Sequence, residues 1–224
     1  MRLSGALAAA IAVLALTTAG CTRAIEGTPM ANNAPPPAVI TDDCSGILIG
    51  YSDAPVRIEI FTEPQCPACA RLQRDFGAEI ADYVGQGELA VTYRPMTFLD
   101  LGTDYSARVS NAMFLAAGDG TTGEEFQAFV EDLWSHQQPE GSAGPTDDEM
   151  ADMAKDSGVG SDQIDKIAAG SDGVDVEQMA DQNTDLLSGF AGQVSTPTVY
   201  NLIDDELVEI DDNWLSDLMK RFNG

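Results

Sequence analysis

Basic residues are scarce in this chain of 224 residues. Lysine and arginine together number 11 against 37 aspartates and glutamates, which gives a formal net charge of −26. A chain this acidic is repelled by a phosphate backbone, so the composition excludes nucleic acid binding. The acidic residues are spread over the expected helices, and we interpret them as a solvated surface, with adaptation to salt as a second interpretation.

Histidine and cysteine, the usual zinc ligands in proteins, are also few. The four cysteines include one pair with CxxC spacing, Cys66 and Cys69, and the single histidine is His136. A structural zinc site usually needs four such ligands. The composition therefore disfavours zinc, and copper carriage by the two thiols alone remains conceivable.

The first twenty residues differ in composition from the rest. Arg2 precedes an apolar run over residues 3–16, and Thr18-Ala19-Gly20-Cys21 follows. The pattern predicts a signal peptide over residues 1–20, with an uncleaved membrane anchor as the alternative. In either case we expect the rest of the chain on the extracytoplasmic side, where disulfides can form.

Residues 21–43 show little apolar periodicity and include Pro35-Pro36-Pro37. This composition predicts a semi-extended tether without chemistry of its own. The tether would hold a domain over residues 44–224 away from the membrane.

The most informative motif is Cys66-Pro67-Ala68-Cys69. It follows the apolar run Val56–Phe61, which is dense in β-branched residues and predicts a central strand. Apolar residues then recur at helical intervals and predict a helix from Pro67 to about Val84. Two thiols this close at a helix start can form a disulfide with little backbone movement, and proline suits the first helical position. The motif indicates a redox-active dithiol.

The two cysteines of the motif are expected to differ. Cys66 would lie at the exposed helix tip, where the helix dipole favours a thiolate, and Cys69 would lie one turn deeper on the apolar stripe. We therefore interpret Cys66 as the attacking thiol and Cys69 as the resolving thiol. This chemistry needs no cofactor and no metal. An inert disulfide staple is the alternative for the pair.

Cys44 is the odd cysteine of the chain. It could be a free thiol near the first strand, bridge to another chain or exchange with the dithiol, and we leave it out of the catalytic set.

The remaining pattern predicts an α/β fold. Further strands are expected at residues 47–49, 89–94, 198–203 and 207–210, and a closing helix at 214–222. Between residues 103 and 189 only helical spacing is present. The order β-α-β, helices, β-β-α predicts a thioredoxin fold with an all-helical domain inserted, at about residues 103–189, between its β-α-β and β-β-α halves.

From about Ile47 to Phe222 the chain resembles the DsbA-like thiol-disulfide oxidoreductases of the thioredoxin superfamily, in their secreted or membrane-tethered bacterial branch. The segments that carry the resemblance are Asp53–Val56, Cys66–Cys69, the insertion with Ser106 and Phe126–Phe129, and Val194–Thr198.

The resemblance implies the composition of the site. Pro197 is expected to be cis and to pack opposite the dithiol, and Thr196 is expected to offer backbone hydrogen bonds to an extended substrate. Together with Pro67 and Ala68, these two residues would form the substrate-binding loops.

The chain also departs from its apparent relatives. Many of them carry an acid six residues before the first cysteine as a proton relay, whereas Ile60 stands at that place, with Glu59 and Glu63 nearby, so the relay is unassigned. The dipeptide Pro67-Ala68 lacks the histidine of strongly oxidising members, which implies a less extreme oxidising power.

Thr18-Ala19-Gly20-Cys21 resembles the lipobox of bacterial lipoproteins, although Thr18 stands where leucine is usual. This likeness implies that Cys21 carries a lipid anchor. We therefore expect the protein at the extracytoplasmic face of a bacterial cell membrane.

These observations predict a thiol-disulfide oxidoreductase that exchanges disulfides with protein substrates. Oxidase activity is ranked slightly ahead of reductase or isomerase activity because of the inserted helices. A membrane or secreted redox partner would regenerate the dithiol. The non-enzymatic alternative is a thioredoxin-fold binding module or chaperone without redox turnover.

Overall fold

The computed structural model describes residues 34–223, so the predicted signal peptide, Cys21 and the first part of the predicted tether lie outside the described residues. The described chain is built around one six-stranded sheet. Its strands are β1 (Ala38–Ile40), β2 (Ile47–Ile49), β3 (Val56–Thr62), β4 (Leu89–Pro95), β5 (Thr198–Asn201) and β6 (Glu206–Val208).

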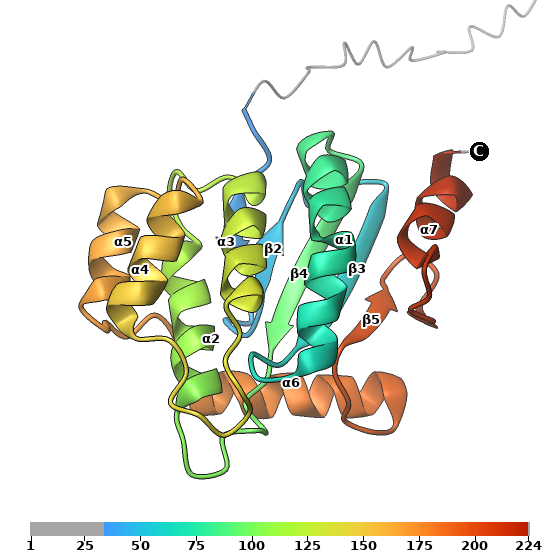
Figure 1. Cartoon of the computed structure of the whole chain (residues 1–224). Helices are drawn as coiled ribbons and strands as arrows, with labels where there is room; N and C mark the ends of the chain where they lie inside the picture. The colour runs from blue at the N-terminus through green and yellow to red at the C-terminus, as the bar shows by residue number, and fades with distance from the viewer. Residues whose placement is uncertain (1–33, 224) are drawn as a thin grey trace, which may run out of the picture. The chain divides into compact units, whose positions relative to one another are not determined.

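By their place in the chain, the described helices are one helix between β3 and β4, an insertion of several helices between β4 and β5, and one C-terminal helix (Figure 1). Helix α1 (Pro67–Gly85) connects β3 to β4, and α7 (Trp214–Asn223) closes the chain. The insertion between β4 and β5 contains α2 (Tyr105–Ala116), α3 (Gly123–Ser135), α4 (Asp147–Asp156), α5 (Ser161–Ala168) and α6 (Val176–Ala191).

Strand β3 is central in the sheet, whose order is β1-β2-β4-β3-β5-β6. It pairs parallel with β4 and antiparallel with β5. Only Arg57 of the seven residues in β3 is exposed. A strand paired on both edges has its backbone groups satisfied, and its β-branched side chains suit a pleat that is covered on both faces. The structure confirms the predicted central position of β3. It also confirms the two predicted halves, β3-α1-β4 and β5-β6-α7.

The two faces of β3 contact different helices. Val56, Ile58 and Ile60 share one core cluster with the apolar stripe of α1. Alternate residues of a strand point to opposite faces, and Phe61 accordingly packs against Leu187 and Phe190 of α6. Helix α6 therefore covers the face of the sheet opposite α1.

Helices α1 and α3 pack closely because a glycine stands at their contact. A Cβ atom placed on Gly77 would lie 2.5 Å from Cγ of Glu131, well inside van der Waals distance. Helix α3 itself begins with a capping box, in which the Thr122 side chain and the Glu125 side chain each accept a backbone N–H of the first turn. The cap and the glycine fix α3 beside the dithiol helix.

The structure refines the prediction of an inserted helical domain. The buried residues of α2–α5, such as Met113, Phe126 and Ile167, belong to the same core cluster as β3 and α1. The insertion therefore extends the core of the thioredoxin fold, and its last helix α6 lies across the strands (Figure 1).

The prediction of a tether as far as residue 43 is wrong at its C-terminal end. Ala38–Ile40 forms β1, which pairs antiparallel with β2, and the carbonyl of Pro36 accepts the N–H of Gly123 at the start of α3. Asp43 forms an ion pair with Arg94 of β4 at 2.8 Å. The folded domain thus includes residues that were assigned to the tether.

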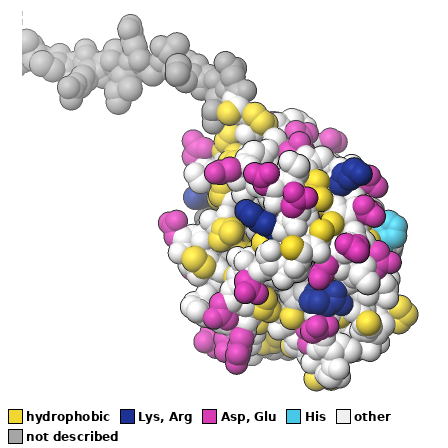
Figure 2. Space-filling model, turned by 90° about the vertical axis from the view of Figure 1, so that its left-hand side faces the viewer, with side chains coloured by type: hydrophobic (Ala, Val, Ile, Leu, Met, Phe, Trp, Pro, Cys, Tyr) yellow, Lys and Arg dark blue, Asp and Glu magenta, His cyan; other side chains and the backbone are white. Residues whose placement is uncertain are grey.

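Acidic side chains are scattered over the face shown in Figure 2, among fewer basic ones. This distribution fits a solvated acidic surface. No helix within residues 34–223 has both the length and the apolar character that crossing a membrane requires.

Candidate active site

The dithiol lies where the central strand β3 passes into α1. The N–H of Cys66 bonds to the carbonyl of Glu63 at 3.0 Å, which closes a turn with Pro64 at its second position, where the fixed φ of proline is favoured. Cys66 is the N-cap residue of α1, and Pro67 occupies the start of the helix. The turn therefore directs the Cys66 side chain toward the positive end of the helix dipole.

The two thiols differ in exposure as the sequence predicted. Cys66 is half-buried, whereas Cys69 is 1% exposed and belongs to the core cluster. Both are free thiols. A substrate sulfur can therefore approach Cys66 but not Cys69.

The loop before β5 lies against the dithiol. The Thr196–Pro197 peptide bond is cis, as the resemblance implied, and the Cys66 sulfur lies 3.3 Å from the carbonyl oxygen of Thr196, to which only the protonated thiol can donate. Of the four predicted loop residues, Thr196 contacts the Cys66 sulfur, Pro67 and Ala68 follow Cys66 at the start of α1, and Pro197 lines a cavity together with Ala68.

Hydrogen bonds to sulfur separate the acidities of the two cysteines. The Cys69 thiol, together with the Thr196 hydroxyl and the N–H groups of Cys69 and Ala68, lowers the pKa of Cys66 to about 5, although partial burial acts against this. Burial raises the pKa of Cys69 well above its ordinary value, and the neighbouring Cys66 thiolate raises it further. At neutral pH the site therefore holds one thiolate and one thiol.

Glu63 is a buried acid next to the dithiol. Its side chain is 0% exposed, and burial raises the pKa of Glu63 to about 7, with the charges of Asp100 and Cys66 acting in the same direction. Hydrogen bonds from the Ser106 hydroxyl and the Gln65 N–H oppose this rise. Glu63 can therefore exchange a proton near neutral pH, close to the reacting sulfur.

A polar network connects Glu63 to the insertion. The side-chain amide of Gln65 donates to Asp100 at 2.8 Å and to the Ser106 hydroxyl at 3.0 Å. Asp100 also accepts the N–H groups of Ser106 and Ala107, both at 2.8 Å, at the start of α2. The turn before α1 is thereby fixed to the first inserted helix.

A cavity of about 350 Å³ adjoins the dithiol. Ala68 and Pro197 line it, and its apolar wall comes from Leu72 and Phe76 of α1 and from Ile210. The cavity opens beside the Cys66 loop and offers apolar surface, so it has room for the residues of an extended substrate that flank the reacting substrate cysteine.

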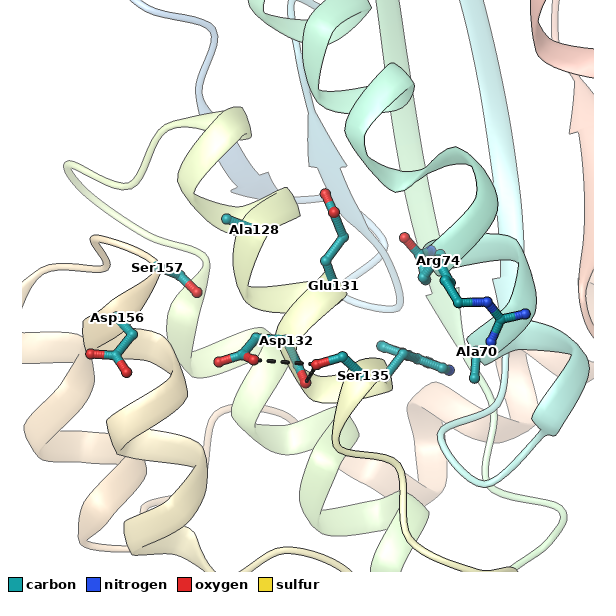
Figure 3. Close-up of a pocket in the computed structure, with 10 residues that line it drawn as sticks. Ala70, Arg74, Ala128, Glu131, Asp132, Ser135, Asp156 and Ser157 are labelled. Atoms are coloured by element: carbon teal, nitrogen blue, oxygen red, sulfur yellow. Dashed lines mark hydrogen bonds between the residues drawn. The ribbon is translucent and has the colours of Figure 1, made fainter.

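A larger cavity of about 760 Å³ lies between α1, α3 and α4 and contains none of the predicted site residues. Figure 3 shows Glu131 and Asp132 of α3 facing it, with Arg74 of α1 on one side and Asp156 at the end of α4 on the other. The volume of a cavity therefore does not identify the active site here. The dithiol with its smaller cavity is the candidate active site.

Within the described residues, Cys44 has no hydrogen bond to the dithiol or its loops. It is an exposed free thiol with a positive φ of 56° in the turn between β1 and β2. His136 ends α3 as its C-cap residue and bonds to Asp132. Among the described residues, no cluster of three or more histidine, cysteine or acidic side chains is placed to hold a metal.

Sequence reasoning missed the polar residues that surround the dithiol turn. Gln65, Asp100 and Gln137 contact the turn or its network, and none of them belongs to a motif. Glu63 was noted only as an acid near the motif. Its burial depends on α2, which lies some forty residues further along the chain, so no local pattern could reveal it.

Comparison with known proteins identifies the family of the domain. Residues 42–220 match the family model described as Thioredoxin. Serine/threonine-protein kinase PknE of Mycobacterium tuberculosis is 32% identical over 162 residues, which represent 70% of this chain and 28% of that protein. The chain thus spans little more than a quarter of this curated relative.

Solved structures have the same fold. MdbA, a thiol-disulfide oxidoreductase from Corynebacterium matruchotii, superimposes with a TM-score of 0.69 at 25% identity, covering 83% of this chain and 93% of MdbA. Reduced DsbA from Mycobacterium tuberculosis superimposes with a TM-score of 0.62 at 20% identity, covering 80% of this chain and 93% of DsbA.

Proposed function

The chain is a DsbA-like member of the thioredoxin family, and we propose that it exchanges disulfides with protein substrates outside the cytoplasm, with Cys66 as nucleophile and Cys69 as resolving thiol. The observation that carries the proposal is the asymmetry of the dithiol. A half-buried cysteine with its pKa lowered to about 5 lies beside a buried cysteine whose pKa is raised, opposite the Thr196–Pro197 loop.

The exchange follows from this asymmetry. In the reducing direction Cys66 attacks a substrate disulfide and Cys69 resolves the mixed disulfide, and oxidation runs the same steps in reverse. For oxidation, a substrate thiolate attacks Cys66 of the Cys66–Cys69 disulfide, and Cys69 leaves and takes up a proton. The second substrate thiol, as its thiolate, then attacks the substrate sulfur of the mixed disulfide and releases Cys66 as a thiolate. The substrate loses two electrons and gains a disulfide, and the enzyme becomes a dithiol.

The acidity of Cys66 favours oxidation of the substrate over its reduction. A stabilised thiolate makes the reduced enzyme more stable and hence makes its disulfide a stronger oxidant. The pKa of Cys66, about 5, lies between the values of about 3.5 and about 7 typical of strongly oxidising and reducing dithiols of this kind. We therefore rank oxidase ahead of reductase and isomerase.

Equilibration of the purified domain with glutathione buffers tests the direction. We expect a reduction potential above that of thioredoxin, about −270 mV, and below that of DsbA, about −120 mV. A value at or below −270 mV would contradict the oxidase assignment and leave the exchange chemistry intact.

Oxidation of a reduced client protein tests the function itself. Cys66→Ser should abolish the activity with the fold retained, and Cys44→Ser is the matched control that should keep it. A parent protein that does not oxidise the client, and that binds it equally well with and without Cys66→Ser, would instead favour a binding module or chaperone.

The export and anchoring of the protein are part of the proposal. Residues 1–20 would be removed and Cys21 would carry the lipid, which places the dithiol at the extracytoplasmic face, where a membrane or secreted partner can reoxidise it. Intact mass measurement of the cell-derived protein tests this. An acyl-glycerol adduct on Cys21 is expected, and a chain that retains residues 1–20 would rule it out.

A further inference from the structure

The loop that follows α3 contacts the turn that carries the nucleophile. The side-chain amide nitrogen of Gln137, just beyond the end of α3, donates to the carbonyl of Pro64 at 2.8 Å and to that of Cys66 at 3.0 Å. Gln137 is half-buried. One amide group of the insertion thus joins both ends of the Pro64–Cys66 segment.

These carbonyls determine where the sulfur lies. The Cys66 carbonyl also accepts the N–H groups of Cys69 at 3.1 Å and Ala70 at 3.2 Å, the first bonds of α1. The orientation of the Cys66 peptide group sets the direction of the Cys66 side chain at the N-cap. A donor that fixes this group therefore keeps the sulfur facing the N–H groups of Ala68 and Cys69.

Further contacts hold the Gln137 loop in place. The N–H of Gly141 donates to the side-chain oxygen of Gln65 at 2.7 Å, and the N–H of Gln138 donates to the Tyr105 hydroxyl at 3.0 Å. Arg108 of α2 donates to the carbonyl of Pro145. The amide of Gln137 is thus presented by a loop with its own supports on α2 and on the dithiol turn.

We propose that Gln137 is a positioning residue for thiol–disulfide exchange, which holds the Cys66 peptide group so that the helix N–H groups stabilise the attacking thiolate. This inference rests on the proposed function. It gives the insertion a second role beyond covering the core, because α3 and the loop after it orient the reacting cysteine.

Two methionine substitutions test the role. Gln137→Met keeps the length of the side chain and removes its donors, and Gln138→Met is the matched control, because the bond of Gln138 to Tyr105 uses its backbone. Iodoacetamide alkylation of Cys66 between pH 4 and pH 9 measures the pKa and the reactivity of the thiolate without any client protein. Exchange with a model disulfide is measured on the same samples.

For Gln137→Met we expect an upward shift of the Cys66 titration by about one pH unit, the equivalent of one to two hydrogen bonds. Exchange should slow by about tenfold below about pH 5, where the thiolate fraction limits the rate. Gln138→Met should match the parent protein. An unchanged titration and rate in Gln137→Met, or equal effects of both substitutions, would overturn the proposal.

A second variant tests the role of Gln137 in case Gln137→Met does not fold. Gln137→Ala admits water to the two carbonyls at this half-buried position and should show the same upward shift of the titration. A parent-like titration in folded Gln137→Ala would also overturn the role of Gln137. If the parent protein itself fails to exchange disulfides while its Cys66 titration still responds to Gln137, the proposed function is wrong and the positioning role stands.

Discussion

The sulfur of Cys66 lies 3.3 Å from the carbonyl oxygen of Thr196, although the two residues are 130 positions apart in the sequence. The sheet brings them together. Phe61 near the end of β3 pairs with Thr198 at the start of β5, so the turn that follows β3 and the loop that precedes β5 meet at the same edge. The site therefore depends on both halves of the thioredoxin fold and tolerates the long insertion between them.

The first prediction concerns the order of thiol reactivity. With a pKa of about 5, Cys66 should be mostly thiolate at pH 6, whereas the buried Cys69 should be a thiol. In the reduced protein we expect iodoacetamide at pH 6 to modify Cys66 at least tenfold faster than Cys69. Peptide mass mapping measures both rates, with the urea-unfolded protein as control. Faster modification of Cys69 in the folded protein would reverse the assigned roles.

The second prediction concerns the Thr196 hydroxyl. Among the described residues it is buried with no hydrogen-bond partner and is therefore free to donate to the Cys66 thiolate, which lowers the pKa of Cys66. Thr196→Val keeps the shape of the side chain and removes this donor, so the pKa of Cys66 should rise by about 0.5–1 unit, within the range of an ordinary hydrogen bond. Ser195→Ala, one residue before, is the control and should leave the titration unchanged. An identical alkylation profile for Thr196→Val would show that the hydroxyl does not act on the sulfur.

The local pattern of the chain predicted the elements that hold the dithiol. Strand β3 and helix α1 were recognisable because β-branched residues and an apolar stripe of helical period mark them. Strand β1 was not predicted, because three residues after a proline-rich segment carry almost no periodic signal and their pairing with β2 is a tertiary contact. The same limit applies to Gln137, whose role depends on where a loop docks.

The third prediction concerns stability and Glu63. Its pKa of about 7 in the folded protein exceeds the value of about 4.3 in an unfolded chain. The folded state therefore binds this proton more tightly, so the contribution of Glu63 to stability is complete below about pH 4 and is lost as the pH rises through about 7.

Glu63→Gln removes this loss. Relative to the parent protein, the variant should gain about 3–4 kcal/mol of unfolding free energy between pH 4 and pH 8. Urea denaturation at several pH values measures the difference, and Glu209→Gln, at an exposed position, should give a nearly flat difference. A difference for Glu63→Gln that stays constant over this range would mean that Glu63 has no raised pKa.

The last prediction concerns the buried ion pair between Arg94 of β4 and Glu59 of β3. The Arg94 side chain donates to Glu59 at 2.8 and 3.0 Å, and the two side chains are 7% and 6% exposed. Two charges this deeply buried are stable only as a pair, so Arg94→Met should destabilise the protein by about 3–5 kcal/mol through the uncompensated Glu59 carboxylate.

Adding Glu59→Leu to Arg94→Met removes the unpaired charge and should restore most of the lost stability, because a well-packed apolar pair often replaces a buried ion pair at little cost. Urea denaturation of both single variants and of the double variant measures the coupling. Asp43, the second carboxylate on Arg94, is half-exposed and remains hydrated in every variant. A double variant as unstable as the sum of the two single variants would show that the two side chains are not energetically coupled.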